Sequence, residues 1–201
     1  MFPGLFDGDF SGTFRVNVKS GAAETTVDNV SAPTWETPVA VQPAGQAPPS
    51  ILDLMFMIDT TGSMCDELSY LQTELADVIG RVEDDFGNVL IRLSVNFYRD
   101  SGDDYVVRSF PFSTDIDDSL TKLAAQSCDG GGDYPEAVHT ALADAVFEHT
   151  WSAAARARLL FLVLDAPPHY TTSVVESLHQ TMPDAAEKGI RIVPVAGERR
   201  R

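Results

Sequence analysis

The pattern of apolar and polar positions along the chain predicts buried strands that alternate with amphipathic helices. Residues 51–58 form a mostly apolar run of strand length that stops at Asp59, which is typical of a buried parallel strand. After a short polar turn, apolar residues recur at steps of three or four and predict a helix with one buried stripe: Leu68, Leu71, Leu75, Val78, Val82 and Phe86. The residues from Asp59 to Ser63 therefore lie on a strand-to-helix turn.

The sequence after residue 86 continues the same alternation. Strands are predicted at residues 88–100, 105–112, 159–165 and 190–195. The second of these strands is predicted as an antiparallel partner at a sheet edge. Helices are predicted at residues 114–126, from Pro135 onward and at 171–188. Strands that alternate with helices predict a doubly wound α/β fold, in which a mostly parallel sheet carries helices on both faces.

Candidate cation ligands cluster where the buried strands end. In doubly wound sheets, ligands bind beyond the carboxyl ends of the strands, at the point where the strand order reverses. Two buried strands end in Asp59 and Asp165, and a glycine-rich loop that ends in Asp133 lies between them in the sequence. Thr61 and Ser63 add hydroxyl oxygens on the turn after Asp59. Because oxygen ligands suit hard cations, these residues predict a site for Mg²⁺, Mn²⁺ or Ca²⁺.

Two of these residues also have simpler interpretations. Ser63 fits a helix N-cap in a loose capping box, although capping leaves Asp59 and Thr61 unexplained. Asp133 equally fits a cap of the helix predicted to begin at Pro135. Both interpretations stay open at the level of the sequence.

Charge and composition narrow the classes of partner. The chain of 201 residues has a formal net charge of −16 and 44% hydrophobic residues, which is enough for the core of one ordinary domain with an appendage. The negative charge argues against nucleic acid and anionic membrane surfaces and favours cations or basic surfaces. No apolar run reaches the roughly 20 residues of a membrane helix. The start of the chain lacks the pattern of a signal peptide.

Residues 1–50 differ from the rest of the chain in composition and in the pattern of apolar residues. They contain six of the twelve prolines and no helical periodicity. Alternating apolar residues predict one strand at residues 14–19, a second strand is predicted near 39–41, and residues 42–50 predict a proline-stiffened linker. We therefore expect two parts, a β-containing lead-in with its linker at 1–50 and an α/β domain at 51–201.

Four motifs of the α/β domain together resemble those of a von Willebrand factor type A domain. They are Met57–Met64, Phe97–Asp100, Gly130–Ala137 and Leu164–His169. The resemblance covers about residues 51–196 and is closest to the bacterial members of the family. It implies a Rossmann-like sheet that lacks the family's last strand and helices, so we expect a C-terminally truncated domain. The exposed fifth strand would then favour association through the sheet edge.

The resemblance also implies a metal-ion-dependent adhesion site, in which a cation leaves one coordination position open for an acidic group of a partner. The family's ligand pattern is matched by Asp59, Thr61, Ser63 and Asp165. Asp133 stands nearest to the place of a threonine from the second loop of the site. The implied function is metal-dependent protein binding, without catalysis, with a protein partner that presents Asp or Glu. The resemblance also favours an extracellular or cell-surface location.

An enzyme is the alternative. An apolar strand followed by Asp-Thr-Thr-Gly-Ser also resembles the nucleophile loop of phosphoaspartyl hydrolases of the haloacid-dehalogenase type. That magnesium-dependent chemistry attacks with the first aspartate, here Asp59, and neutralises phosphate with a lysine. Lys122 is the only lysine between Asp59 and Asp165 in the sequence, and Asp165 has no acidic neighbour. The sequence therefore favours the binding module over the hydrolase.

Cys65 and Cys128 are the two cysteines of the chain, and each stands next to a loop of the predicted site. Both loops meet at the predicted metal, so a disulfide is one interpretation, and it would indicate an oxidising compartment. The interpretation that we prefer is two unrelated small buried residues, because a disulfide requires Cα atoms within about 7 Å of each other.

The substitution Asp133→Thr separates the ligand interpretation of Asp133 from the capping interpretation. If ionised Asp59, Asp165 and Asp133 surround a divalent cation, the cluster has a net charge of −3 + 2 = −1. An incoming carboxylate about 4 Å from one excess charge meets a repulsion on the order of 4 kcal/mol at an effective dielectric of 20. The substitution should therefore weaken magnesium binding in a calorimetric titration and, at saturating metal, strengthen binding of an acidic peptide. Equal magnesium affinities would exclude Asp133 as a ligand, because threonine also caps helices.

Overall fold

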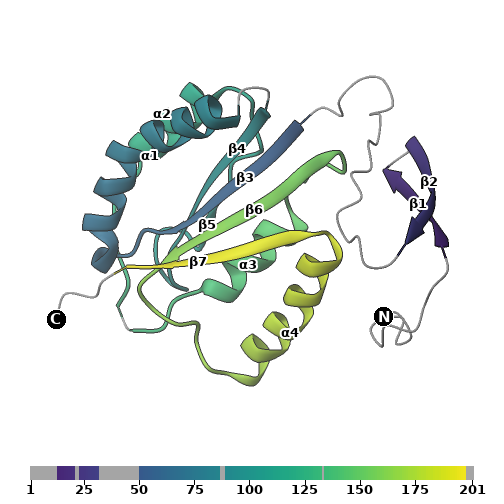
Figure 1. The fold of residues 1–201 in the computed structure, drawn as a ribbon. Helices are drawn as coiled ribbons and strands as arrows, with labels where there is room; N and C mark the ends of the chain where they lie inside the picture. Colours follow the sequence, from purple (N-terminus) through teal and green to yellow (C-terminus); the bar gives the residue numbers. More distant parts are fainter. Residues whose placement is uncertain (1–12, 21–22, 32–49, 87–88, 133, 198–201) are drawn as a thin grey trace. The chain divides into compact units, whose positions relative to one another are not determined.

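The structure, a computed structural model, divides the chain into two compact units (Figure 1). The units are Met1–Pro48 and Pro49–Arg201. The described residues are 13–20, 23–31, 50–86, 89–132 and 134–197.

The first unit contains one antiparallel strand pair. Strand β1 (Thr13–Ser20) pairs with β2 (Ala23–Ser31). The strand predicted at residues 14–19 is present. The sequence of β2 did not predict a strand, because its threonines and valines do not alternate cleanly with polar residues. The strand predicted near residues 39–41 lies outside the described residues.

A five-stranded sheet forms the centre of the second unit. Its strands are β3 (Ser50–Asp59), β4 (Val89–Tyr98), β5 (Val107–Arg108), β6 (Ala155–Leu164) and β7 (Ile190–Ala196). In space they follow the order β5-β4-β3-β6-β7, and all neighbours are parallel except β5 with β4. The order reverses at β3, so the switch point lies between β3 and β6.

Helices cover both faces of this sheet (Figure 1). They are α1 (Cys65–Phe86), α2 (Ile116–Ala124), α3 (Val138–Phe147) and α4 (Thr172–Glu187). Helices α1 and α2 pack on one face, and α3 and α4 pack on the other. This arrangement confirms the predicted doubly wound α/β fold with a mostly parallel sheet.

Strand β3 contributes to the hydrophobic core on both of these faces. Leu54, Phe56 and Ile58 pack with residues of α1. Met55 and Met57, which alternate with them, pack with residues of α3 and α4. Because both faces are covered, this strand is apolar at nearly every position instead of at every second one.

The buried face of α1 differs from the predicted stripe. Leu68 and Leu75 are buried as expected, and Ile79 joins them in the core. Val78 and Phe86, both predicted in the stripe, are 48% and 65% exposed. Steps of three and of four from Leu75 reach Val78 and Ile79, and both steps are compatible with a helical face. Packing against the sheet, and not periodicity, selects Ile79.

The edge strand predicted at residues 105–112 shortens to β5. Side chains of β4 occupy the backbone N–H and carbonyl groups of Phe110, so these groups do not extend the ladder between the strands. The hydroxyl of Ser94 donates to the Phe110 carbonyl at 2.8 Å, and the Phe110 N–H donates to Asn96 Oδ1 at 2.7 Å. Pro111 follows and has no N–H for a ladder.

Helix α3 begins at Val138, so the helix start predicted at Pro135 was wrong. The N–H of Glu136 donates to the carbonyl of Pro167 at 3.0 Å. Glu136 also pairs with Pro168 in an isolated parallel bridge. The backbone ahead of α3 is therefore held by the loop after β6 and enters the helix only after Ala137.

Two expectations about surfaces concern the second unit. Within the described ranges, no helix combines the length and the apolar composition of a membrane span. Strand β7 is the outer strand on one side of the sheet, and association through that edge stays a prediction.

Candidate metal centre

Parallel pairing of β3 with β6 brings two acidic residues to the same edge of the sheet. The two strands run in register, with Ile58 opposite Val163. Asp59 is the last residue of β3, and Asp165 directly follows β6. The structure thus places these two predicted site residues at neighbouring strand ends, beside the switch point of the sheet.

Hydrogen bonds to Asp59 shape the turn after β3. Its Oδ1 accepts the backbone N–H of Thr61 at 2.9 Å and the hydroxyl of Thr61 at 2.7 Å. The hydroxyl oxygens of Thr61 and Ser63 lie 3.5 Å apart. Ser63 lies inside the 3₁₀ turn η2 (Gly62–Met64), whose N-cap is Thr61, so the capping interpretation of Ser63 was wrong. One carboxylate and two hydroxyls therefore follow one another in a row of oxygen atoms.

Two carboxylate oxygens at these strand ends have no hydrogen-bond partner among the described residues. They are Asp59 Oδ2 and Asp165 Oδ1, and both atoms are buried. A buried carboxylate oxygen without a partner is costly, and a hard cation is a group that satisfies it. Together with the hydroxyls of Thr61 and Ser63, these atoms fit an oxygen-ligated divalent cation.

The donor set that the structure describes mixes carboxylates and hydroxyls. Across the described part of the chain, no three His, Cys, Asp or Glu side chains gather closely enough to hold a metal ion. Asp133, the third predicted carboxylate, lies outside the described residues. Its role as a ligand or as a helix cap stays a prediction.

The negative charges of this region act on two buried groups. Burial raises the pKa of Asp59 from 3.8 to about 6, the hydrogen bonds from Thr61 oppose the rise, and the charge of Asp165 adds to it. Burial also raises the pKa of Tyr98 at the end of β4, and the charges of Asp59, Glu136 and Asp165 raise it further. The Tyr98 hydroxyl lies beside Asp59 without a well-aligned hydrogen bond.

Glu136 is a carboxylate of this region that the sequence-based prediction missed. It is only 3% exposed. A Cβ atom on Gly131 would come within 3.0 Å of Glu136 Oε1 and within 2.9 Å of the Thr61 Cβ, so these three residues meet at one point. The signal was present, because Glu136 closes the Gly-Gly-Gly-Asp-Tyr-Pro-Glu segment. Pro135, which precedes it, predicted a helix start instead.

The glycine-rich loop ahead of Glu136 depends on two glycines. Gly130 and Gly131 have φ angles of +80° and +72°, a conformation that side chains rarely adopt. The carboxylate of Asp103 occupies the space in which a Cβ atom of Gly130 would lie, and its Oδ2 accepts the N–H of Gly131 at 3.1 Å. The loop is therefore held against the connection between β4 and β5.

The loops after β4 and β6 are joined by a partly buried polar contact. His169 Nε2 and Asp100 Oδ1 lie 2.8 Å apart. The Asp100 N–H also donates to Asp103 Oδ2 at 3.1 Å, so this contact continues to the carboxylate that holds Gly131. His169 is thus a loop residue that helps to hold the loops around the site.

Two backbone hydrogen bonds join the glycine-rich loop to the turn after β3. The N–H of Asp129 donates to the carbonyl of Thr60 at 3.1 Å. The N–H of Gly62 donates to the carbonyl of Gly130 at 3.2 Å. The two loops that flank the predicted site are therefore in direct contact.

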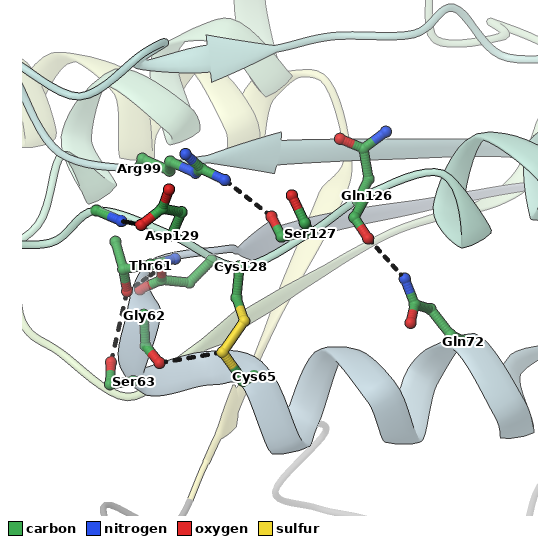
Figure 2. Close-up of a disulfide and its surroundings, with 12 residues drawn as sticks. Thr61, Gly62, Ser63, Cys65, Gln72, Arg99, Gln126, Ser127, Cys128 and Asp129 are labelled. Atoms are coloured by element: carbon green, nitrogen blue, oxygen red, sulfur yellow. Dashed lines mark hydrogen bonds between the residues drawn. A yellow bond between two sulfur atoms is a disulfide. The ribbon is translucent and has the colours of Figure 1, made fainter.

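A disulfide between Cys65 and Cys128 also joins these two loops (Figure 2). The Cα atoms of the two residues lie 5.3 Å apart, within the range that disulfides require. The preferred interpretation of two unrelated cysteines was therefore wrong. The spacing of the cysteines beside the two loops was the correct signal, but a sequence does not give the Cα distance.

Comparisons with known proteins agree with this architecture. A family model described as von Willebrand factor A domain matches residues 53–195. An ariadne-like RING finger protein of Acanthamoeba polyphaga mimivirus is 32% identical over 127 residues, which is 62% of this chain and 12% of that protein. The chain therefore spans a small part of the length of this relative. The expected similarity of the sequence to bacterial members of the family stays a prediction.

Without metal, the stability of the domain should fall as the pH rises through the raised pKa of Asp59. The folded state holds this proton more tightly than the unfolded state between pH 3.8 and about 6. The contribution of the protonated carboxyl to stability is therefore fully present below pH 3.8 and is lost progressively up to about pH 6. A shift of about two pKa units corresponds to on the order of 3 kcal/mol. Urea unfolding in chelator at pH 5 and at pH 7.5 measures the part of this loss that falls above pH 5, on the order of 1.4 kcal/mol, because the loss begins near pH 3.8.

The control for this measurement is Asp59→Asn, which has the same size and does not titrate. Other carboxyl groups also contribute to the pH dependence, and the two proteins share them. The free energy of unfolding of the wild-type protein should drop more between pH 5 and pH 7.5 than that of Asp59→Asn. The same drop in both proteins would contradict a raised pKa of Asp59.

Proposed function

The chain belongs to the von Willebrand factor A domain family, and on this basis we propose that its second unit is a metal-dependent protein-binding module. Members of this family commonly take part in protein interactions. The finer proposal is that a divalent cation, Mg²⁺ or alternatively Mn²⁺ or Ca²⁺, is held at the ends of β3 and β6. The partner would be a protein that presents an Asp or Glu side chain.

One observation carries this proposal. Asp59 Oδ2 and Asp165 Oδ1 are buried at neighbouring strand ends and have no hydrogen-bond partner among the described residues. Two ionised carboxylates that share a buried place repel each other, and either a proton or a cation must relieve the repulsion. The oxygen-rich surroundings favour a hard cation over a transition metal that prefers nitrogen or sulfur.

The residues that would hold the cation differ in how deeply they lie. Asp59 and Thr61 are almost fully buried, with 0% and 1% exposure. Ser63 is exposed, so its hydroxyl lies on the solvent side of the turn. Glu136 and Asp133 are further acidic candidates, as direct or water-bridged ligands. The bound cation would supply positive charge and an open coordination position for the partner's carboxylate.

The similarity to the mimivirus protein is compatible with a modular role. Because the matched region is a small part of that long RING finger protein, we propose that the domain acts as an interaction module joined to other functions. The disulfide supports an oxidising compartment for this chain, in line with the extracellular or cell-surface location that the family favours.

We do not propose the phosphoaspartyl hydrolase. Its lysine would have to face Asp59, whereas Lys122 is paired with Asp118 on α2 and lies over the ring of Phe110. Asp59 itself is fully buried, with Oδ1 engaged by Thr61. A nucleophile must reach its substrate, and no observation on the described residues favours that access.

Thermal unfolding tests the proposed cation site. Saturating magnesium or manganese should raise the melting temperature of chelator-treated protein. A free metal concentration of 100 times Kd stabilises by about 2.7 kcal/mol, which corresponds to roughly 5–10 °C for a domain of this size. Asp59→Asn should abolish most of the rise, and Glu136→Gln should reduce it if Glu136 contributes.

The matched control is Asp84→Asn, which removes the same formal charge from an exposed position on α1. This variant should keep the full response to metal. A peptide with one aspartate should bind only in the presence of metal, and its asparagine counterpart should not bind. Identical melting curves of the wild-type protein in chelator and in excess metal would overturn the proposal.

A further inference from the structure

The Cys65–Cys128 disulfide connects the two loops that frame the proposed cation site. We propose that this disulfide positions the glycine-rich loop, so that the cation affinity of the domain depends on the oxidation state of the two cysteines. The inference rests on the proposed function, because it concerns the affinity of the same site. The effect of the disulfide depends on how each cysteine is anchored.

Cys65 lies on the rigid side of the link. It is the first residue of α1 and follows Ser63 by two positions. The next turns of this helix are fixed to the sheet, because Leu68 and Leu75 are buried in the core together with β3. The disulfide therefore ties its other end to a helix that cannot shift without disturbing the core.

Cys128 lies at the start of the glycine-rich loop, and the chain ahead of it is anchored independently. Gln72 Nε2 on α1 donates to the carbonyls of Leu123 and Gln126 at 3.1 Å and 3.0 Å. The guanidinium of Arg99 donates to the carbonyl of Ser127 at 2.8 Å (Figure 2). None of these contacts involves the disulfide, so opening it should leave residues 123–127 in place.

The chain after Cys128 has weaker anchors. Residues 130–132 are three consecutive glycines, which have the greatest backbone freedom to lose on ordering. The two backbone hydrogen bonds to the turn after β3 and the contact with Asp103 hold this segment. These hydrogen bonds are 3.1–3.3 Å long, whereas those that anchor the chain ahead of Cys128 are 2.8–3.1 Å long. Opening the disulfide should therefore release the loop locally.

Release of this loop would act on the site because the loop lies against it. Gly131 leaves no room for a Cβ atom beside Thr61 and Glu136. The same loop leads directly to Asp133 and Glu136. If the loop is mobile before a cation binds, ordering it lowers the affinity, whereas an intact disulfide provides this order in advance.

The disulfide is open to the chemistry that would regulate it. Both cysteines are only partly buried, so a dithiol reductant can reach them. A thiolate of the reductant bonds to one sulfur, and the other cysteine leaves as a thiolate that takes up a proton. The second thiol of the reductant then displaces the first cysteine. The two cysteines gain two electrons and two protons, and the reductant becomes a disulfide.

Linkage gives this proposal a second consequence. If the disulfide strengthens cation binding by some factor, the bound cation must stabilise the disulfide against reduction by the same factor. Magnesium should therefore shift the equilibrium between the protein and a dithiol buffer toward the oxidised protein. Couplings between two sites are commonly about 5- to 150-fold.

The experiment compares oxidised protein, protein reduced and freed of reductant under nitrogen, and the double variant Cys65→Ser with Cys128→Ser. Thiol counting confirms each state, and calorimetry measures magnesium affinity. Reduced protein and double variant should bind magnesium at least about fivefold more weakly than oxidised protein. Treatment of the double variant with reductant is the matched control and should change nothing.

Amide hydrogen exchange without metal provides a readout that does not depend on the cation. The N–H groups of Gly62 and Asp129, which join the two loops, should exchange faster after reduction. The amides of β3 should stay protected, which shows that the domain remains folded.

The outcomes separate this inference from the proposed function. Equal magnesium affinities of folded oxidised and reduced protein would overturn the inference and leave the cation site standing. Equal exchange at Gly62 and Asp129 in both states would also overturn it. Magnesium binding by neither form would overturn the inference and the proposed function together. If reduction unfolds the whole domain, so that β3 loses its protection, the disulfide is a general stabiliser, and the proposal of local positioning fails.

Discussion

Pairing between β3 and β6 is the constraint on which the rest of the second unit depends. Because the two strands are parallel and adjacent, their carboxyl ends lie at one edge of the sheet. The order of the sheet reverses at this pair, so the chain leaves β3 toward one face and β6 toward the other. Asp59 and Asp165 are brought together by this backbone arrangement and not by any attraction between their side chains.

Burial of these two carboxylates costs free energy, and hydrogen bonds within the protein offset only part of that cost. Asp59 is completely buried, and its Oδ1 is satisfied by two hydrogen bonds from Thr61. Its Oδ2 and the Oδ1 of Asp165 are left without partners among the described residues. Cores on both faces of β3 supply the stability that tolerates these groups. Incomplete satisfaction at otherwise well-packed strand ends is what a binding site requires and what a purely structural turn would avoid.

The surrounding loops gain their order from each other. His169 and Asp100 join two of them, Asp103 connects this pair to Gly131, and the disulfide closes the link to α1. These contacts are spread over four connections that are distant in the sequence. A single polar substitution in any one of them can therefore shift the position of a potential ligand without touching it.

Much of this fold could be predicted from the sequence, because its signals are local. The apolar run that ends in Asp59 and the glycine-rich segment before Glu136 are readable without a structure. The burial of Glu136 was not, because it depends on a hydrogen bond from its N–H to Pro167 in another loop. The disulfide was not predicted for a similar reason, since it depends on a Cα distance set by tertiary packing.

At some positions the local sequence pattern is compatible with two structures, and tertiary packing determines which of them forms. Val78 and Ile79 both fit the stripe of α1, and only contact with the sheet selects Ile79. The strand predicted at residues 105–112 is shorter than expected because the side chains of Ser94 and Asn96 form hydrogen bonds with the backbone of Phe110, which lies far from them in the sequence. Periodicity describes an element, but it does not describe the competition between its backbone partners.

We expect a cation to satisfy the two carboxylate oxygens at the ends of β3 and β6 that have no partner among the described residues. A crystal of the protein grown with manganese tests it most directly, because anomalous scattering locates the ion without assumptions about the protein. We expect a peak within about 2.5 Å of both Asp59 Oδ2 and Asp165 Oδ1. Well-ordered density for both side chains with no anomalous peak between them would contradict it.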